Sequence, residues 1–331
     1  MREKKDQQEK VKELTEQLQE GIKNLFESNK YREYLQAMAK FHNYSFNNSL
    51  LIWAQRPDAS AVCGYRGWQT KFGRTVNPGA KGIMIYEPAS YKRTLREVVT
   101  DEKGDPILDK DGNKVTQEVE RTFPTFKVGY VFAYEDTTGK PLPSTVSILD
   151  RDVDNYDSVM AALQKISPAP IRFADFDGSA NGYYDLVNRE IVVKASLPQA
   201  QKVKTAIHEV AHSILHDKID GLDQEATKRE MEVSAESVAF VVCSWIGMQT
   251  NDYSFGYISG WSAGKELVEL QRKMEVIRST ASMIISGIDG ELIQQMPMIE
   301  EVEEEQEMLQ TVTVVSVQKN KPQRSVGHRR R

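Results

Sequence analysis

The sequence is poor in cysteine and has no long apolar run, and both absences limit what kind of protein it can be. Two cysteines, Cys63 and Cys243, are too few for a disulfide framework, and this is compatible with a reducing cytoplasm. The longest apolar run near the front, Leu50 to Ala54, is far too short to cross a membrane. The charged start, residues 1–6, has no apolar segment behind it and is unlike a signal peptide. We therefore expect a cytoplasmic protein that does not contact membranes.

The composition is that of a folded protein. An apolar content of 40% with 27% charged residues suits a globular chain, and 331 residues are enough for two domains with sizeable cores. The end of the chain is different, because residues 300–307 are acidic, residues 319–331 are basic, and only a short Val-rich run lies between them. We predict a disordered charged tail over residues 291–331.

Histidine is scarce, yet three of the five histidines lie between residues 208 and 216. The segment from His208 to His212 reads H-E-x-x-H, and the apolar residues around it recur at helical spacing. On a helix, positions i and i+4 share a face, so both imidazoles can reach one zinc ion. Glu209 lies beside them, where a carboxylate can accept a proton from water at the metal. The segment therefore predicts a zinc site with Glu209 as the catalytic base.

The third ligand has to come from elsewhere in the chain. His216 lies about 12 Å along the helix axis from His208, too far to share its ion, and we interpret it as a surface histidine at the helix end. A second helix, expected from about residue 223 to residue 245, carries Glu232 and Glu236 four residues apart. One of these carboxylates can bind the metal while the other orients a ligand histidine through its free ring nitrogen. The alternative is a solvated acidic face.

Resemblance to other H-E-x-x-H proteases assigns the two glutamates. In those whose third ligand is a glutamate, a downstream E-x-x-x-[DE] supplies the metal ligand first and the histidine partner second. This resemblance implies Glu232 as the ligand and Glu236 as the residue that orients a histidine.

The stretch from 31 to 100 is locally basic and rich in aromatic residues. It has ten Lys and Arg against four Asp and Glu. Basic side chains can follow a phosphate backbone while aromatic rings stack on unpaired bases, although most aromatic residues in a folded chain lie in its core. Composition alone is a weak signal for binding of single-stranded DNA, and the candidate contacts are basic, polar and aromatic side chains of this stretch: Asn43, Trp53, Arg66, Trp68, Lys71, Lys81 and Tyr86.

The order of motifs in this stretch resembles the N-terminal single-stranded-DNA-binding domain of the ArdC antirestriction family. The family has a Y-S-x-x-N segment before a Leu-rich helix, here residues 44–48, then a W-x-x-[LF]-G-type turn and a V-x-x-G-x-[KR]-G turn into a strand. The positions that fill the two turns are Trp68, Phe72, Gly73, Val76, Gly79, Lys81 and Gly82, with one extra residue between Trp68 and Phe72. Further on, residues 232–236 match the family's E-x-x-A-E, and residues 257–261 look like its Y-[IL]-x-x-W segment.

The resemblance implies an α+β protein with two domains. A helix-and-sheet single-stranded-DNA-binding domain is expected over residues 1–150, with a charged β-hairpin insertion at 91–123. A zincin-like (H-E-x-x-H) metallopeptidase domain is expected over residues 151–290. The implied function is protection of a mobile element's incoming DNA from host restriction. Two alternatives stay open: a DNA-protecting module whose zinc is structural or vestigial, and a repressor-cleaving protease of the ImmA/IrrE kind.

Overall fold

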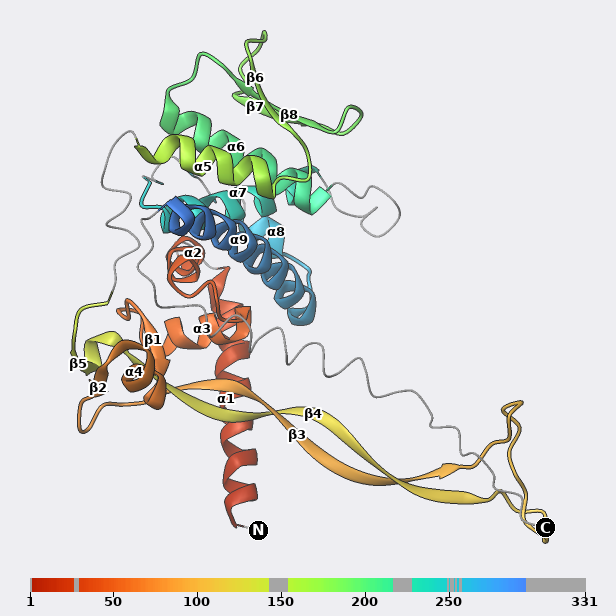
Figure 1. Ribbon diagram of the computed structural model, residues 1–331. Helices are drawn as coiled ribbons and strands as arrows, with labels where there is room; N and C mark the ends of the chain where they lie inside the picture. Colours follow the sequence, from red (N-terminus) through yellow and green to blue (C-terminus); the bar gives the residue numbers. More distant parts are fainter. Residues whose placement is uncertain are drawn as a thin grey trace, which may run out of the picture. The chain divides into compact units, whose positions relative to one another are not determined.

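The computed structural model describes residues 2–26, 30–142, 154–216, 228–248, 250, 253, 255 and 258–295, and it confirms the predicted α+β class (Figure 1). Most of the tail predicted from residue 291 lies outside these residues. Its first residues do not, because the last helix, α9 (Leu267–Gln295), continues past the expected start of the tail. Tyr257, the first residue of the Y-[IL]-x-x-W segment, also lies outside the described residues.

Three helices open the chain: α1 (Arg2–Leu25), α2 (Lys30–Lys40) and α3 (Phe46–Gln55). α1 is amphipathic, and its apolar residues at spacings of three and four are buried: Leu14, Leu18, Ile22 and Leu25. α3 starts after Ser45, whose hydroxyl accepts a hydrogen bond from the backbone N–H of Asn48 at 3.3 Å. This N-cap fixes where α3 begins and therefore which of its residues face the neighbouring sheet.

That sheet is antiparallel, in the order β1–β4–β3, and consists of β1 (Val62–Gly64), β3 (Ile83–Val98) and β4 (Thr116–Ala133). The pairing of β3 with β4 runs from Ile83↔Val131 to Val98↔Thr116 and includes the stretch expected as a hairpin insertion. Figure 1 shows the two strands, in orange and yellow, extending beyond the helices. Exposed ion pairs, such as Lys92–Glu120 at 2.6 Å, and the stacked rings of Tyr91 and Phe123 join the strands there.

Side chains of α3 cover part of the open edge of β3. The amide of Asn48 accepts from the backbone N–H of Tyr86 and donates to the carbonyl of Tyr86, both at 2.9 Å. Gln55 bonds Met84 in the same way, at 2.9 and 2.8 Å. Backbone groups at a sheet edge need partners, and these two amides supply them where no strand follows. Asn48, the asparagine of the Y-S-x-x-N segment, is thus an anchor between helix and sheet.

The rest of the N-terminal half is short elements: α4 (Tyr65–Phe72), β2 (Arg74–Val76), a 3₁₀ turn η1 (Tyr134–Asp136) and β5 (Thr137–Gly139). α4 ends at Gly73, which has a positive φ of 59°. A residue without Cβ adopts that conformation at low cost, and the chain then turns directly into β2, which pairs with β5.

The C-terminal half places a three-stranded sheet against helices. Its elements are α5 (Asp154–Ile166), β6 (Ile171–Ala174), β7 (Gly182–Asp185), β8 (Glu190–Lys194), α6 (Gln199–His216), α7 (Lys228–Trp245), α8 (Ile258–Ser262) and α9. β8 lies in the middle, parallel to β6 and antiparallel to β7. Its three central residues, 191–193, are fully buried, as expected of a strand covered on both faces. β7 is therefore an edge strand, and it lies along α6.

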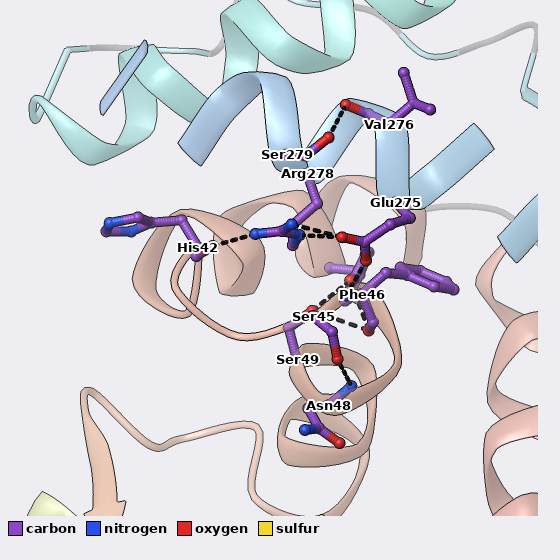
Figure 2. A network of polar contacts seen from close by, with 10 residues as sticks. His42, Ser45, Phe46, Asn48, Ser49, Glu275, Val276, Arg278 and Ser279 are labelled. Atoms are coloured by element: carbon purple, nitrogen blue, oxygen red, sulfur yellow. Dashed lines mark hydrogen bonds and ion pairs between the residues drawn. The ribbon is translucent and has the colours of Figure 1, made fainter. Parts of the chain in front are cut away.

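The two halves are packed together, and residues Met1–Glu291 form one unit by their contacts. α2 packs on α7, and a polar network joins α9 to the start of α3 (Figure 2). In that network Glu275 accepts from the backbone N–H of Phe46 at 2.7 Å and from Arg278, which also donates to the carbonyl of His42 at 2.9 Å. The boundary near residue 150 stays a prediction. Among the described helices, none is long and apolar enough to span a bilayer.

Candidate metal centre and nucleic-acid-binding residues

Helix α6 presents the two histidines of the H-E-x-x-H segment side by side. Its buried face, with Ile207, Val210 and Ala211 fully buried, is held in the core. His208 and His212, one turn apart, point their Nε2 atoms at each other across 3.1 Å. Core packing on one side of α6 thus fixes the direction of both imidazoles on the other.

Glu232 completes a triangle of ligand atoms from the neighbouring helix α7. Its Oε2 lies 3.6 Å from Nε2 of His208 and 3.6 Å from Nε2 of His212. In a tetrahedral site with bonds of about 2.0–2.1 Å, neighbouring ligand atoms are about 3.3 Å apart. The triangle therefore fits a tetrahedral zinc ion with only small movements, and three protein ligands leave a fourth position open. Among the described residues, these three form the group of His, Cys, Asp and Glu that can hold a metal ion.

Glu236 lies one turn further along α7, behind the first histidine. Its Oε2 is 3.5 Å from Nδ1 of His208, the ring nitrogen that faces away from the triangle. A carboxylate in this place orients a ligand imidazole and makes it more basic. The positions of Glu232 and Glu236 agree with the roles that the protease resemblance implies, and these roles stay predictions.

The charges of the site shift the pKa values of its members. Hydrogen bonds to His208 and then His212 hold the pKa of Glu232 well below its usual range. Burial works against the charged form of His208, but the carboxylates of Glu232, Glu209 and Glu236 together outweigh it and raise its pKa. The site is thus strongly attractive to a positive charge, which is the electrostatic requirement of a cation site.

Glu209 lines the cleft and is largely shielded from solvent. Its side chain is only 6% exposed, and burial raises the pKa of its carboxyl group. The backbone N–H of Tyr184 in β7 donates a hydrogen bond to it. A buried carboxylate beside a metal site, with its charged form disfavoured, suits a group that must accept and return a proton.

Strand β7 approaches this helix closely because residue 182 has no side chain. A Cβ on Gly182 would lie 2.5 Å from Cγ2 of Thr205, 2.9 Å from the backbone oxygen of Val192 and 3.4 Å from Cγ of Glu209. The absence of a side chain here lets the edge strand β7 and helix α6 form opposite walls of one cleft.

Gly182→Ala should therefore lower the free energy of unfolding by about 1–3 kcal/mol, because Thr205 and the backbone of Val192 would have to move. Gly64→Ala is the matched control, since a Cβ there meets nothing within 4 Å and its φ of −62° is ordinary. Gly64 is the N-cap of α4, where alanine is less favourable than glycine, so we expect the control to lose less than about 1 kcal/mol and less than Gly182→Ala. Urea unfolding of both variants measures the difference, and equal values would contradict the close approach of β7.

The cleft has a volume of about 650 Å³ and contains all four residues of the predicted site and Glu236. Edge strand β7 forms one wall, with Tyr183 39% exposed. His216 also lines it: its Nε2 is 3.4 Å from the carbonyl of Met231 and its ring lies 5.4 Å from that of His212. His216 thus ends α6 and stays outside the metal-binding group, as expected, but it is half-buried in the cleft wall and not on the open surface.

The residues predicted to contact DNA fall into three groups by exposure. Asn43, Arg66, Lys71 and Lys81 are exposed. Trp53 and Tyr86 are half-buried: the ring of Trp53 packs 5.8 Å from that of Tyr34, and the hydroxyl of Tyr86 is 2.8 Å from that of Thr15. The prediction for the third group, Trp68, needs correction.

Trp68 is a core residue in this structure. It is 1% exposed, and its indole N–H donates to the carbonyl of Phe132 at 2.9 Å. A buried ring with a satisfied N–H cannot stack on a base, so Trp68 supports α4 against the sheet instead. Exposed rings that sequence reasoning did not select lie beside the basic residues: Tyr65 is 56% exposed next to Arg66, and Tyr130, 44% exposed, packs on Gly82 next to Lys81. The period of two along β4 gives no signal for Tyr130, because Val128, on the same face by that period, is buried.

The fold and the site together define an H-E-x-x-H metallopeptidase-type domain joined to a helix-and-sheet domain. Comparison with known families agrees: residues 4–132 match the N-terminal domain of the anti-restriction factor ArdC, and residues 165–243 match the IrrE N-terminal-like domain, a peptidase M78 family. The chain thus combines a region that matches the ArdC N-terminal domain with a later region that matches the IrrE-like, M78 peptidase domain.

The individual relatives share only 18–25% sequence identity with this chain. An uncharacterized protein of Bacillus anthracis is 25% identical over 321 residues, covering 86% of this chain and 53% of that protein, so the chain spans about half the length of this curated relative. Two crystal structures of the antirestriction protein ArdC from the R388 plasmid are 18% identical to the chain. The metal-free form has a TM-score of 0.39 and covers 77% of this chain and 87% of its own; the Mn(II)-bound form has a TM-score of 0.47 and covers 86% and 99%.

Proposed function

We propose that this chain is a cytoplasmic, antirestriction-type protein of a mobile element, with residues 1–150 binding single-stranded DNA and residues 151–290 forming a zinc-dependent peptidase. The main support for peptidase activity is the triangle formed by His208, His212 and Glu232, with the buried Glu209 beside it. The ArdC match of residues 4–132 supports the DNA half.

Zinc is the metal that this ligand set favours. Two imidazoles with one carboxylate suit a borderline ion in tetrahedral geometry, whereas Mn²⁺ prefers more oxygen ligands. Elemental mass spectrometry of untagged protein should find about one zinc per chain. A chain that contained manganese instead would contradict the assignment of zinc while leaving the site intact.

Bound in the triangle, zinc would polarise a peptide carbonyl and make a water molecule more acidic. The residues of the chain perform the remaining steps. β7 is an edge strand that lines the cleft, and an extended peptide can lie along it as an added strand. Glu209 accepts a proton from the attacking water and then returns it to the leaving amine nitrogen as the peptide bond breaks. Glu236 keeps the imidazole of His208 in place during these transfers.

The open fourth position favours a catalytic site over a structural zinc site. Structural sites usually close four protein ligands around the ion, and the described residues bring three together here. A DNA-protecting module with a structural zinc remains the second candidate, supported by the same ArdC match. A repressor-cleaving protease is the third, supported by the IrrE-like match.

The proposed binding of single-stranded DNA can be tested by measuring how the affinity changes with salt concentration. Lys81→Gln should weaken binding of a labelled oligothymidylate several-fold and reduce the slope of log K against log salt by about 0.7, because one phosphate contact is lost. Lys165→Gln is the control: Lys165 is an exposed lysine in α5 that pairs with Glu291 at 3.2 Å. Fluorescence anisotropy across a salt series measures both, and duplex DNA bound as tightly as the single strand would contradict the proposal.

A further inference from the structure

Helix α7 contacts the metal site with one face and the N-terminal half of the chain with another. One face turns Glu232 and Glu236 toward the histidines of α6. Ser237, the next residue, turns away from the cleft and is fully buried against α2, where its hydroxyl lies 2.8 Å from that of Tyr31. The third metal ligand and this contact between the two halves are thus only five positions apart on one rigid helix.

The hydrogen bond between Tyr31 and Ser237 has a defined direction. Ser237 donates its only hydroxyl hydrogen to the carbonyl of Val233, at 2.6 Å. The hydroxyl of Tyr31 must then donate to Ser237 Oγ. Tyr31 is itself fully buried, and burial raises its pKa, so its hydroxyl stays protonated and can donate this bond. A bond between two buried groups fixes the position of α7 more strictly than apolar contact does.

Other contacts join α2 to α7 and to the residues that follow α7. The ring of Tyr31 packs edge-on against Phe255 at 5.2 Å, and the guanidinium of Arg32 lies 5.7 Å from the ring centre of Phe240. Arg32 also donates to the carbonyl of Thr250. α2 therefore contacts α7 and the residues that follow it at several points, and among these contacts the Tyr31–Ser237 bond is the closest in sequence to Glu232.

We propose that Tyr31, a residue of the ArdC-type half, is a positioning residue for the metal centre of the peptidase half. By holding α7 through Ser237, it keeps the carboxylates of Glu232 and Glu236 within reach of His208 and His212. The inference rests on the proposed function, since it takes Glu232 as a ligand. It adds that Glu232 reaches the histidines only when α2 of the N-terminal half is packed on α7. Metal binding by the peptidase half therefore depends on the ArdC-type half.

The chain contains a matched control for this bond. Tyr34 lies one turn along α2, is also fully buried, and donates to Ser49 Oγ at 2.8 Å, while Ser49 donates to the carbonyl of Phe46 at 3.0 Å. The two tyrosines thus make the same kind of bond to a buried serine, although the hydroxyl of Tyr34 also lies 3.5 Å from the carbonyl of Phe46. They differ in the partner: Ser49 belongs to α3 of the N-terminal half, and Ser237 belongs to the ligand-bearing helix.

The experiment compares Tyr31→Phe and Tyr34→Phe with the wild type in the full chain. Both variants should lose similar thermal stability. Zinc affinity, measured by competition with a chromophoric chelator, should fall about three- to tenfold in Tyr31→Phe and stay unchanged in Tyr34→Phe. Partners of ligand residues typically change metal affinity 10–100-fold, and Tyr31 acts one step further out. The visible spectrum of the cobalt(II)-loaded protein should shift in Tyr31→Phe alone, and backbone amides of α7 should exchange faster in its metal-free form.

Two results would contradict the proposed role of Tyr31. Equal zinc affinities, cobalt spectra and α7 exchange in the two variants would overturn it while leaving the zinc site in place. A wild type that binds no zinc would overturn the proposed function and this inference with it. If Tyr31→Phe does not fold, Ser237→Ala removes the same bond from the other side and should give the same three- to tenfold loss.

Discussion

Replacing Glu232 with alanine should reduce the zinc content from about one ion per chain to a small fraction of that. The two histidines would remain 3.1 Å apart on one helix, but the only negative ligand of the triangle would be gone. Elemental mass spectrometry of untagged protein, after dialysis against a weak chelator, measures the loss. Circular dichroism should show an unchanged helix content, because Glu232 is on the cleft side of α7.

Two further glutamates of α7 make this prediction specific. Glu230 pairs with Lys265 at 2.6 Å and with Lys273 at 3.4 Å, away from the histidines, so Glu230→Ala should keep its zinc. Glu236→Ala should still bind zinc, with an affinity lower by about 10–100-fold, because Glu236 only orients His208. Zinc retained in Glu232→Ala but lost in Glu236→Ala would reverse the two assignments.

The parts of the site that lie on one helix could be predicted from the sequence. His208 and His212 share a face because of the helical period alone, so their convergence needs no knowledge of the fold. Glu232 lies on another helix, and the residues left open whether it or Glu236 meets the histidines; only resemblance to other proteases chose between them. The contact between Tyr31 and Ser237, 206 positions apart, has no local signal at all.

The residues predicted to contact DNA show what the sequence alone cannot decide. Trp68 and Tyr65 are both aromatic residues in the same short helix, α4, and composition treats them alike. The structure buries Trp68 and leaves Tyr65 exposed, because α4 packs one face on the sheet. Burial of this kind is decided by tertiary packing, and a short helix gives too few positions for its apolar face to be read from spacing.

Gly182 and Asn48 illustrate a second limit. A glycine in a strand signals a close approach, but not what approaches; here it is α6, at Thr205 and Glu209. The asparagine of the Y-S-x-x-N segment can be recognised as part of a pattern, yet its partner, the backbone of Tyr86, lies 38 residues away. In both cases the residue is visible in the sequence and its physical role requires the packed structure.

Glu209→Gln should leave folding, zinc content and DNA binding intact and reduce peptide hydrolysis by about 10²–10⁴-fold. An amide has the shape of the carboxylate but cannot accept the proton of the attacking water. Since burial disfavours the charged form of Glu209, the neutral amide should not lower the melting temperature of the metal-free protein. The measurement is mass spectrometry of a peptide library incubated with zinc-loaded wild type or variant, counting newly formed N-termini.

The same variant separates the peptidase from the DNA-protecting module. Transfer of an unmodified plasmid into a restricting host reports antirestriction activity, and both proteins can be compared in it. If Glu209→Gln loses protection while it keeps its fold, zinc and DNA binding, then a structural or vestigial zinc site is ruled out, because only proton transfer has been removed. If it protects as well as the wild type, and neither protein cuts any peptide of the library, the peptidase proposal is wrong. Protection would then come from the DNA-binding half, with the zinc triangle serving to hold α6 and α7 together.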